Sequence, residues 1–242
     1  MGTVEGGGNV IQDGLVYFLD VANVKSYSSG NRIYDLSRTE KVGGLLINSP
    51  SYSNLNNGSL VFDGVNQYVS LDKSIATPPN SISKYSFSVW FSPSVLISSG
   101  NTNIYMIFES QNSTNAGSTD NYIQIVPGYG GRISFTTFNF SGNDLNTTTN
   151  RWEINKWYNI TCTYDSTTSK KSIYVNGILE NSTTNSNNFF NTKDNFSLFV
   201  YTFPFNQYFF PCKFSSFMLY TKTLTDGEVL QNYNATRSRF GL

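Results

Sequence analysis

The side chains that most often perform enzymatic chemistry are scarce in this sequence. It contains no histidine, so a Ser-His-Asp triad and a histidine-based zinc site are both excluded. A nucleophilic cysteine would also need a nearby base such as histidine. Cys162 shares one face of an alternating segment with Ile160 and Tyr164, which predicts a small buried hydrophobic side chain. Whether Cys162 is bonded to Cys212 stays open at this point.

Hydrolysis of a glycosidic bond is a reaction that carboxylates alone could catalyse. A retaining mechanism requires two carboxyl groups about 5–5.5 Å apart, and alternate residues on one face of a strand could supply them. Glu109, Glu153 and Glu180 each lack a second acidic residue two or four positions further along. We therefore expect a protein that is not an enzyme.

Tryptophans are the residues that could stack on the rings of a bound sugar. Trp157 begins an apolar segment and is expected in the core. Trp90 has the opposite parity to Phe87 and Val89, so we expect it to face a second layer or solvent. Trp152 lies in a stretch rich in Asn and Thr. It is the candidate for an exposed, ligand-binding aromatic residue.

Residues 201–211 combine six aromatic residues with two prolines. If this segment is exposed, it forms a large apolar patch of the kind that marks a protein interface. Alternatively it closes one end of the folded domain, and both interpretations stay open. The candidate interface residues are Phe203, Phe205, Tyr208, Phe209 and Phe210.

A dozen or more short segments of strand type, separated by turn signals, must position these residues. Residues 85–91 alternate with period two, and Asn176-Gly177 is a strong signal for a type I′ hairpin. A single short helix is predicted from about residue 226, with Thr225 as N-cap and Glu228 completing a capping box. This pattern is typical of an all-β sandwich.

The charge balance and the termini restrict the partners and the location of the protein. Lys and Arg number 16, as do Asp and Glu, which argues against a nucleic-acid-binding protein. No apolar run approaches the ~20 residues needed to cross a bilayer, so no membrane insertion is expected. The first residues resemble no secretory signal, and we expect synthesis in a cytosol. We expect a flexible Gly-rich arm over residues 1–12 and a single domain over residues 13–242.

Four blocks of sequence, in a fixed order, carry a resemblance to a known family. They are Asp13–Asp20, Leu60–Val69, Ile173–Gly177 and the C-terminal block from Tyr220 to Leu242. Together they resemble the laminin-G-like or concanavalin A-like lectin/glucanase jelly roll. More narrowly, they are similar to the version carried by structural proteins of tailed bacteriophages. The resemblance implies a two-sheet antiparallel jelly-roll β-sandwich with one short C-terminal helix.

The resemblance also directs attention to calcium. Relatives often carry two acidic residues in the last strand, and in several of them such carboxylates help to hold a calcium ion. In this sequence those places look like Ser215 and Ser216. Asp20 and Asp63 remain as candidate calcium donors, although Asp63-Gly64 is more simply explained as a tight turn with Gly64 at positive φ. We therefore expect no cofactor, with calcium as the one candidate.

The resemblance implies a non-enzymatic structural protein on the surface of a phage virion, as a capsid decoration, fibre or tail-associated protein made in the host cytoplasm. The expected partners are other virion proteins, further copies of the chain and cell-surface glycans. The alternative is a carbohydrate-binding adhesin or receptor-binding module. A β-glucanase-like glycoside hydrolase is the least favoured function, because the Glu-x-Asp-x-x-Glu-like spacing of the catalytic relatives is missing.

Overall fold

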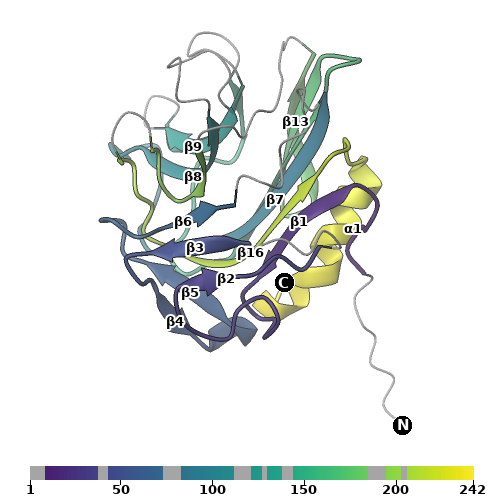
Figure 1. The fold of residues 1–242 in the computed structure, drawn as a ribbon. Helices are drawn as coiled ribbons and strands as arrows, with labels where there is room; N and C mark the ends of the chain where they lie inside the picture. Colours follow the sequence, from purple (N-terminus) through teal and green to yellow (C-terminus); the bar gives the residue numbers. More distant parts are fainter. Residues whose placement is uncertain are drawn as a thin grey trace.

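Two antiparallel β-sheets packed face to face make up the fold, and one helix lies on the outer face of one sheet (Figure 1). The computed structural model describes residues 9–37, 43–72, 83–111, 121–126, 130–137, 144–184, 195–202 and 206–242. The predicted two-sheet antiparallel jelly roll with a short C-terminal helix is confirmed. No helix in these residues is long and apolar enough to cross a membrane.

The sheet that carries the helix, sheet A, is built around β7 and β16, the two longest strands of the described residues. Strand β1 also pairs with β16, so the N-terminal strand lies beside the C-terminal one. In spatial order the strands are β14 (Ile178–Thr183), β13 (Lys170–Val175), β12 (Tyr158–Asp165), β7 (Lys84–Pro93), β16 (Cys212–Tyr220), β5 (Ser59–Phe62) and β4 (Ser51–Ser53), with β1 (Leu15–Asp20) at the side of β16.

Sheet B faces sheet A across the core, and β8 and β15 lie at its centre. Its strands run in the order β11 (Leu145–Asn146), β10 (Arg132–Thr137), β9 (Asn121–Val126), β8 (Tyr105–Gln111), β15 (Asn195–Leu198), β6 (Tyr68–Leu71), β3 (Gly44–Ile47) and β2 (Arg32–Ile33).

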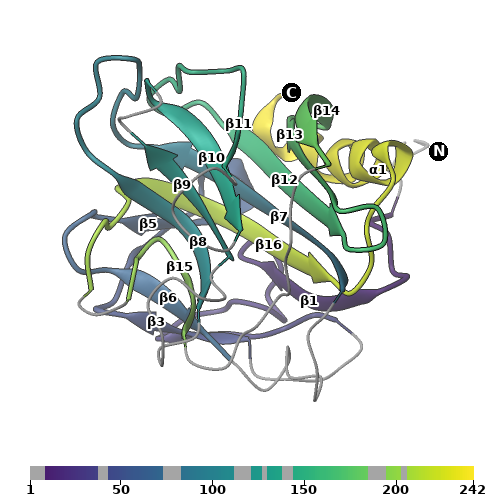
Figure 2. The same cartoon turned by 90° about the horizontal axis from the view of Figure 1, so that it is seen from above.

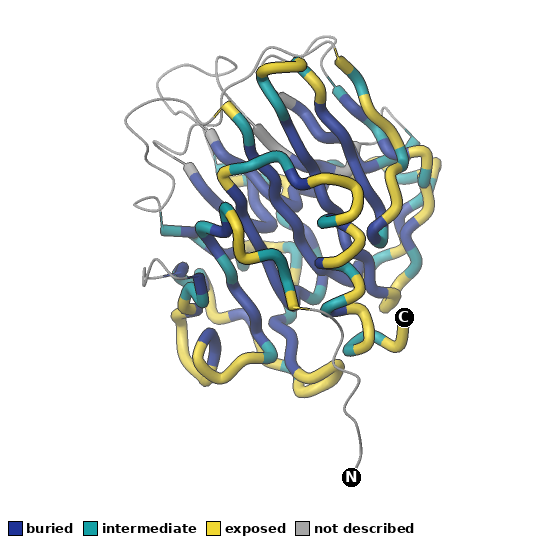
Figure 3. Tube along the Cα trace, turned by 90° about the vertical axis from the view of Figure 1, so that its right-hand side faces the viewer, coloured by how far each residue is buried: buried dark blue, intermediate teal, exposed yellow. Residues whose placement is uncertain are grey.

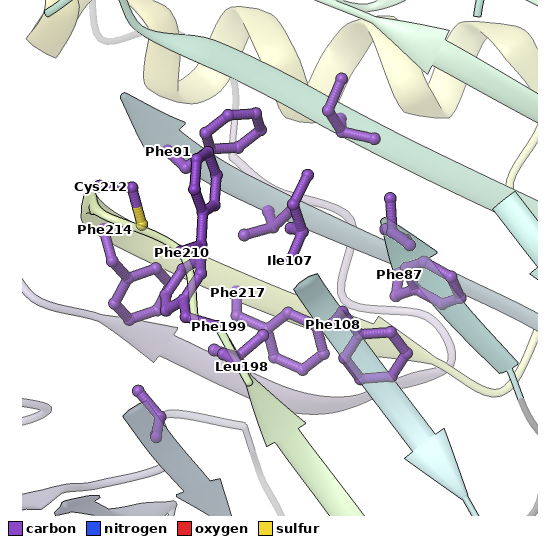
Figure 4. Close-up of a cluster of buried hydrophobic side chains, with 14 of the residues drawn as sticks. Phe87, Phe91, Ile107, Phe108, Leu198, Phe199, Phe210, Cys212, Phe214 and Phe217 are labelled. Atoms are coloured by element: carbon purple, nitrogen blue, oxygen red, sulfur yellow. The ribbon is translucent and has the colours of Figure 1, made fainter. Parts of the chain in front are cut away.

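The core between the sheets is rich in phenylalanine, as Figure 4 shows. Phe87 of β7 lies 4.7 Å from Phe108 of β8, measured between ring centroids, so the two sheets meet through aromatic contacts. Cys162 and Cys212 are both buried and both free. Burial raises the pKa of each thiol well above its ordinary value. The prediction that Cys162 is a small buried hydrophobic side chain is confirmed, and no disulfide joins it to Cys212.

Helix α1 (Asp226–Thr236) covers the outer face of sheet A, with one side exposed and the other against the strands (Figure 3). The predicted capping box of Thr225 and Glu228 is present at its start. Trp90 is fully buried beneath the helix, and its indole N–H donates to Thr236 Oγ1 at 2.9 Å. Trp90 therefore faces a second layer, which is α1 itself.

The N-terminal residues dock on the same helix. The backbone N–H of Ile11 donates to Asn232 Oδ1 at 2.8 Å, and Val10 and Ile11 pack against a buried cluster that contains Val229. Val10 and Ile11, which the prediction placed in a flexible arm over residues 1–12, thus pack on the folded domain. Residues 1–8 lie outside the described residues.

Candidate functional site

A groove of about 540 Å³ opens at the end of the sandwich where β8 and β16 begin. We call it the aromatic groove. Among its described lining residues none carries a charge, and two aromatic side chains contribute exposed surface. The lining residues are Gly64, Thr102, Asn103, Ile104, Tyr105, Tyr208, Phe209 and Pro211.

Tyr208 forms one side of the aromatic groove in a strained backbone conformation. Its φ angle is 57°, in the left-handed region that costs a residue with a Cβ atom roughly 1–2 kcal/mol. The backbone holds this conformation because the Tyr208 carbonyl accepts a hydrogen bond from the Met106 N–H at 2.9 Å. The side chain is 36 % exposed. The fold therefore tolerates strain at a residue that presents an aromatic ring to solvent.

The two residues after Tyr208 pack against aromatic rings of the sandwich. Phe210 is fully buried, and its ring stacks on Tyr105 at 5.3 Å between centroids. Phe209 lies 6.3 Å from the ring of Tyr68. The exposed Asn103, which also lines the groove, donates from Nδ2 to the Tyr105 hydroxyl at 3.2 Å. The aromatic groove thus combines an aromatic wall with polar residues at its edge.

A tight turn after β5 contributes Gly64 to the lining of the aromatic groove. Asp63 Oδ1 accepts hydrogen bonds from the backbone N–H groups of Val65 and Asn66, at 2.8 and 3.4 Å. Gly64 has a φ of 74°, so the predicted turn with positive φ at Gly64 is confirmed. A Cβ atom at this position would lie 2.6 Å from Cδ and 2.8 Å from N of Pro211. Only glycine fits both the conformation and the space.

We predict that Gly64→Ala lowers the free energy of unfolding by about 1–2 kcal/mol or more, because the left-handed conformation and the contact with Pro211 both become unfavourable. Thermal or urea unfolding measures the change. Gly100→Ala is the matched control, since a Cβ atom there meets nothing within 4 Å and its stability should stay within about 0.5 kcal/mol of the wild type. Equal destabilisation of both variants would contradict the special role of Gly64.

None of the three tryptophans forms an exposed platform. Trp152 was expected to be exposed, and that prediction is wrong: the side chain is fully buried. Its indole N–H donates to the Gly131 carbonyl at 2.9 Å, and its backbone pairs with Ile97. Trp157 is buried as expected, with its ring 4.5 Å from Phe240. An aromatic contact for a ligand on the described surface must therefore come from tyrosine or phenylalanine.

The candidate interface residues divide into three groups. Phe210 lies in the core, so its assignment to an exposed interface is wrong. Tyr208 and Phe209 line the aromatic groove. Phe203 and Phe205 lie outside the described residues.

The two candidate calcium donors have other partners. Both carboxylate oxygens of Asp20 accept hydrogen bonds from the guanidinium of Arg239, at 2.6 and 2.9 Å. Asp63 stabilises its own turn through the bonds described above. In the described ranges, no group of three or more His, Cys, Asp and Glu side chains could hold a metal ion. Asp20 and Asp63 thus each take part in contacts within the protein, and calcium binding stays a prediction.

The three glutamates considered for hydrolysis lie in different places. Glu109 of β8 is fully buried and accepts a hydrogen bond from Ser197 Oγ at 2.8 Å. Glu153 precedes β12 and forms an ion pair with Arg151. Glu180 lies on β14.

The carboxylate of Glu180 accepts hydrogen bonds from Thr148 and Thr149. Partial burial raises its pKa, but hydrogen bonds donated by Thr149 and Thr148 outweigh this effect, so the pKa lies below its ordinary value. The backbone N–H groups of these two threonines lie 2.8 and 2.7 Å from Oε2. This carboxylate is thus kept ionised as part of a loop contact.

The sequence belongs to a defined family. A family model described as the Concanavalin A-like lectin/glucanases superfamily, of the laminin G type, matches residues 63–230, which is more than half of the chain. The chain belongs to this family. No curated protein matches the sequence closely enough to count as a relative.

Solved structures with the same fold come from several larger proteins. Domain 4 of AbnA, a GH43 extracellular arabinanase from Geobacillus stearothermophilus, in complex with arabinotriose, has a TM-score of 0.66 at 19% identity, over 90% of this chain and 98% of that one. The binding domain of botulinum neurotoxin DC, in complex with rat synaptotagmin II, has a TM-score of 0.64 at 19% identity, over 93% of this chain and 52% of that one. A mutant Trypanosoma rangeli sialidase displaying trans-sialidase activity has a TM-score of 0.65 at 14% identity, over 98% and 35%. These comparisons show a shared fold, and this chain spans about half of the neurotoxin domain and about a third of the sialidase.

Proposed function

We propose that the protein is a non-enzymatic glycan-binding module and that the aromatic groove is its saccharide site. The observation that carries this proposal is Tyr208, an exposed aromatic residue held at a φ of 57° beside the partly exposed Phe209. A sugar ring offers an apolar face of C–H groups, which an aromatic wall can cover, and a rim of hydroxyl groups. Thr102 and Asn103 are exposed at the edge of the groove and can exchange hydrogen bonds with that rim.

The lining favours a neutral saccharide. A carboxylate or sulfate group entering the aromatic groove would lose hydration, and no cationic side chain lines the groove among the described residues. The volume of about 540 Å³ falls in the range of about 300–1,000 Å³ that is typical of small-ligand clefts. Arabinotriose, which is bound to domain 4 of AbnA, is therefore a reasonable member of a test panel.

The placement of the carboxylates supports a binding function over hydrolysis. Glu109, Glu153 and Glu180 lie on β8, before β12 and on β14, whereas a retaining hydrolase needs a pair about 5–5.5 Å apart. Each of the three is also held by donors of the protein itself. The three carboxylates therefore act as acceptors for contacts within the protein.

We also propose that the module is displayed on a tailed-phage virion. The first and last of the blocks that carry the phage-like resemblance lie side by side, since Leu15 pairs with Tyr220 and Asp20 binds Arg239. Mass spectrometry of purified particles tests this context. Absence of the chain from particles would remove the virion role and leave the glycan-binding proposal standing.

We expect the wild-type chain to bind neutral trisaccharides more tightly than acidic ones. Isothermal titration with maltotriose, cellotriose and arabinotriose, compared with sialyllactose, measures the difference. Dissociation constants in the micromolar to millimolar range are expected for at least one neutral sugar, corresponding to about −8 to −4 kcal/mol. The proposal would be contradicted if no neutral sugar gave a heat of binding, or if only sialyllactose did.

A further inference from the structure

A second groove, of about 600 Å³, lies between the β12–β13 hairpin and the chain that enters α1. Figure 2 shows these two segments at the same end of the molecule. We call it the hydroxyl groove, because six of its lining residues carry a hydroxyl group. They are Thr163, Thr168, Ser172, Tyr174, Thr223 and Thr225.

The floor of the hydroxyl groove follows from strand alternation. Cys162 and Ile173 are paired and point into the core, so the next pair, Thr163 and Ser172, points to the outer face of sheet A. Tyr174 also belongs to this outer face. Its hydroxyl donates to Asp226 Oδ1 at 2.7 Å, which ties the floor of the groove to the first turn of α1.

The second wall is fixed to the sheet by its own hydrogen bond. Thr223 Oγ1 donates to the Tyr164 carbonyl at 2.7 Å. Leu224 contributes a buried apolar surface. Hydrogen bonds of Tyr174 and Thr223 therefore join the two walls of the hydroxyl groove, the β12–β13 hairpin and the segment that enters α1.

The charges around the hydroxyl groove are of both signs. Asp165, Asp226 and Lys170 line it, and Asp165 Oδ2 also pairs with Lys84 Nζ at 3.1 Å. A polyanion would meet the two carboxylates and a polycation would meet the lysines. The hydroxyl groups of Tyr174 and Thr223 donate within the protein but can still accept. A neutral ligand rich in hydroxyl groups can donate to them and to the carboxylates of the lining.

We propose that the hydroxyl groove is a second saccharide-binding site, specific for neutral saccharides. It goes beyond the aromatic groove, because it lies at the opposite end of β16: Pro211 directly precedes this strand and Thr223 follows it. Nine residues of strand separate the two grooves by about 30 Å at ~3.3 Å per residue. A trisaccharide cannot reach both, so the module would bind two glycan segments at once and gain avidity for polymers.

Gly227→Trp tests the proposal by filling the hydroxyl groove. Gly227 lines it, and a Cβ atom at this position meets nothing within 4 Å, so the variant should fold. Leu230→Trp is the matched control, since Leu230 is an exposed residue of the same helix and does not line the groove. Tyr208→Asn removes the aromatic wall of the other site.

The measurement is an NMR titration of the ¹⁵N-labelled full chain with maltotriose, cellotriose and arabinotriose at millimolar concentration. We expect saturable shifts at the amides of Lys170, Asp226 and Gly227. The dissociation constant obtained from these shifts should rise at least tenfold in Gly227→Trp. It should stay unchanged in Leu230→Trp and Tyr208→Asn. Absence of these shifts with all three sugars, or shifts that Gly227→Trp leaves unchanged, would overturn the second site. The amides of Asn103 and Phe209 report the aromatic groove separately, so the failure of either site can be recognised.

Discussion

Replacement of Tyr208 by asparagine is expected to weaken saccharide binding at the aromatic groove about 10- to 100-fold, or about 1.4–2.8 kcal/mol, while the domain stays folded. Asparagine tolerates the left-handed conformation that Tyr208 adopts at a φ of 57°. The lost contact with Tyr201, at 5.8 Å between centroids, is therefore offset in part by relief of strain. We expect a free energy of unfolding within about 1 kcal/mol of the wild type.

Tyr34→Asn is the matched control for this variant. Tyr34 is 46 % exposed and does not line the aromatic groove, so this change should alter neither binding nor stability. A sugar titration followed by NMR at the amides of Asn103 and Phe209 gives the affinity of the aromatic groove, and urea unfolding gives the stability of each variant. Wild-type affinity at these amides in Tyr208→Asn would show that the ring does not contact the ligand. A loss of stability above about 3 kcal/mol would show that the ring serves the core instead.

Replacement of Trp90 by alanine is expected to lower the free energy of unfolding by about 3–5 kcal/mol. The ring is fully buried and lies 4.3 Å from Phe240 and 5.6 Å from Tyr233, between centroids. The change also leaves Thr236 Oγ1 without its indole donor. Because these partners belong to α1 and to the short 3-10 helix Arg237–Phe240, the variant should loosen the helix from sheet A.

Urea unfolding measures the loss, and limited proteolysis of the C-terminal residues shows whether α1 detaches. Val24→Ala is a suitable control, because Val24 is 77 % exposed and its truncation should change stability by no more than about 0.5 kcal/mol. A loss below about 1 kcal/mol for Trp90→Ala would show that α1 does not depend on this stack.

Local sequence signals predicted the local structure well. The Asn176-Gly177 hairpin is confirmed, with φ angles of 51° and 77°, because a two-residue I′ turn needs positive φ at both positions. The capping box of α1 is confirmed for a similar reason, since its partners lie three residues apart. In both cases the interacting groups are neighbours in sequence.

The features that sequence reasoning missed depend on distant partners. Trp152 looked exposed because its neighbours are polar, yet its backbone pairs with Ile97 and its indole binds Gly131. Asp20 looked like a free oxygen donor until Arg239, from the far end of the chain, was found beside it. No local pattern contains either partner.

The segment around Tyr208 shows a third reason for error. A left-handed residue changes the direction of the chain, so alternation on one side of it does not continue on the other. Tyr208 is consequently exposed, whereas Phe210 is fully buried. Composition alone made the segment look uniform, and only the backbone conformation divides it into a groove wall and a part of the core.

The central claim, that the aromatic groove binds a neutral saccharide, is tested most directly by a crystal structure of the protein with the neutral trisaccharide that binds best in solution. We predict electron density for a sugar ring packed against Tyr208 and Phe209, with hydroxyl groups near Thr102 and Asn103. An empty aromatic groove at a sugar concentration that saturates the binding measured in solution would contradict the account.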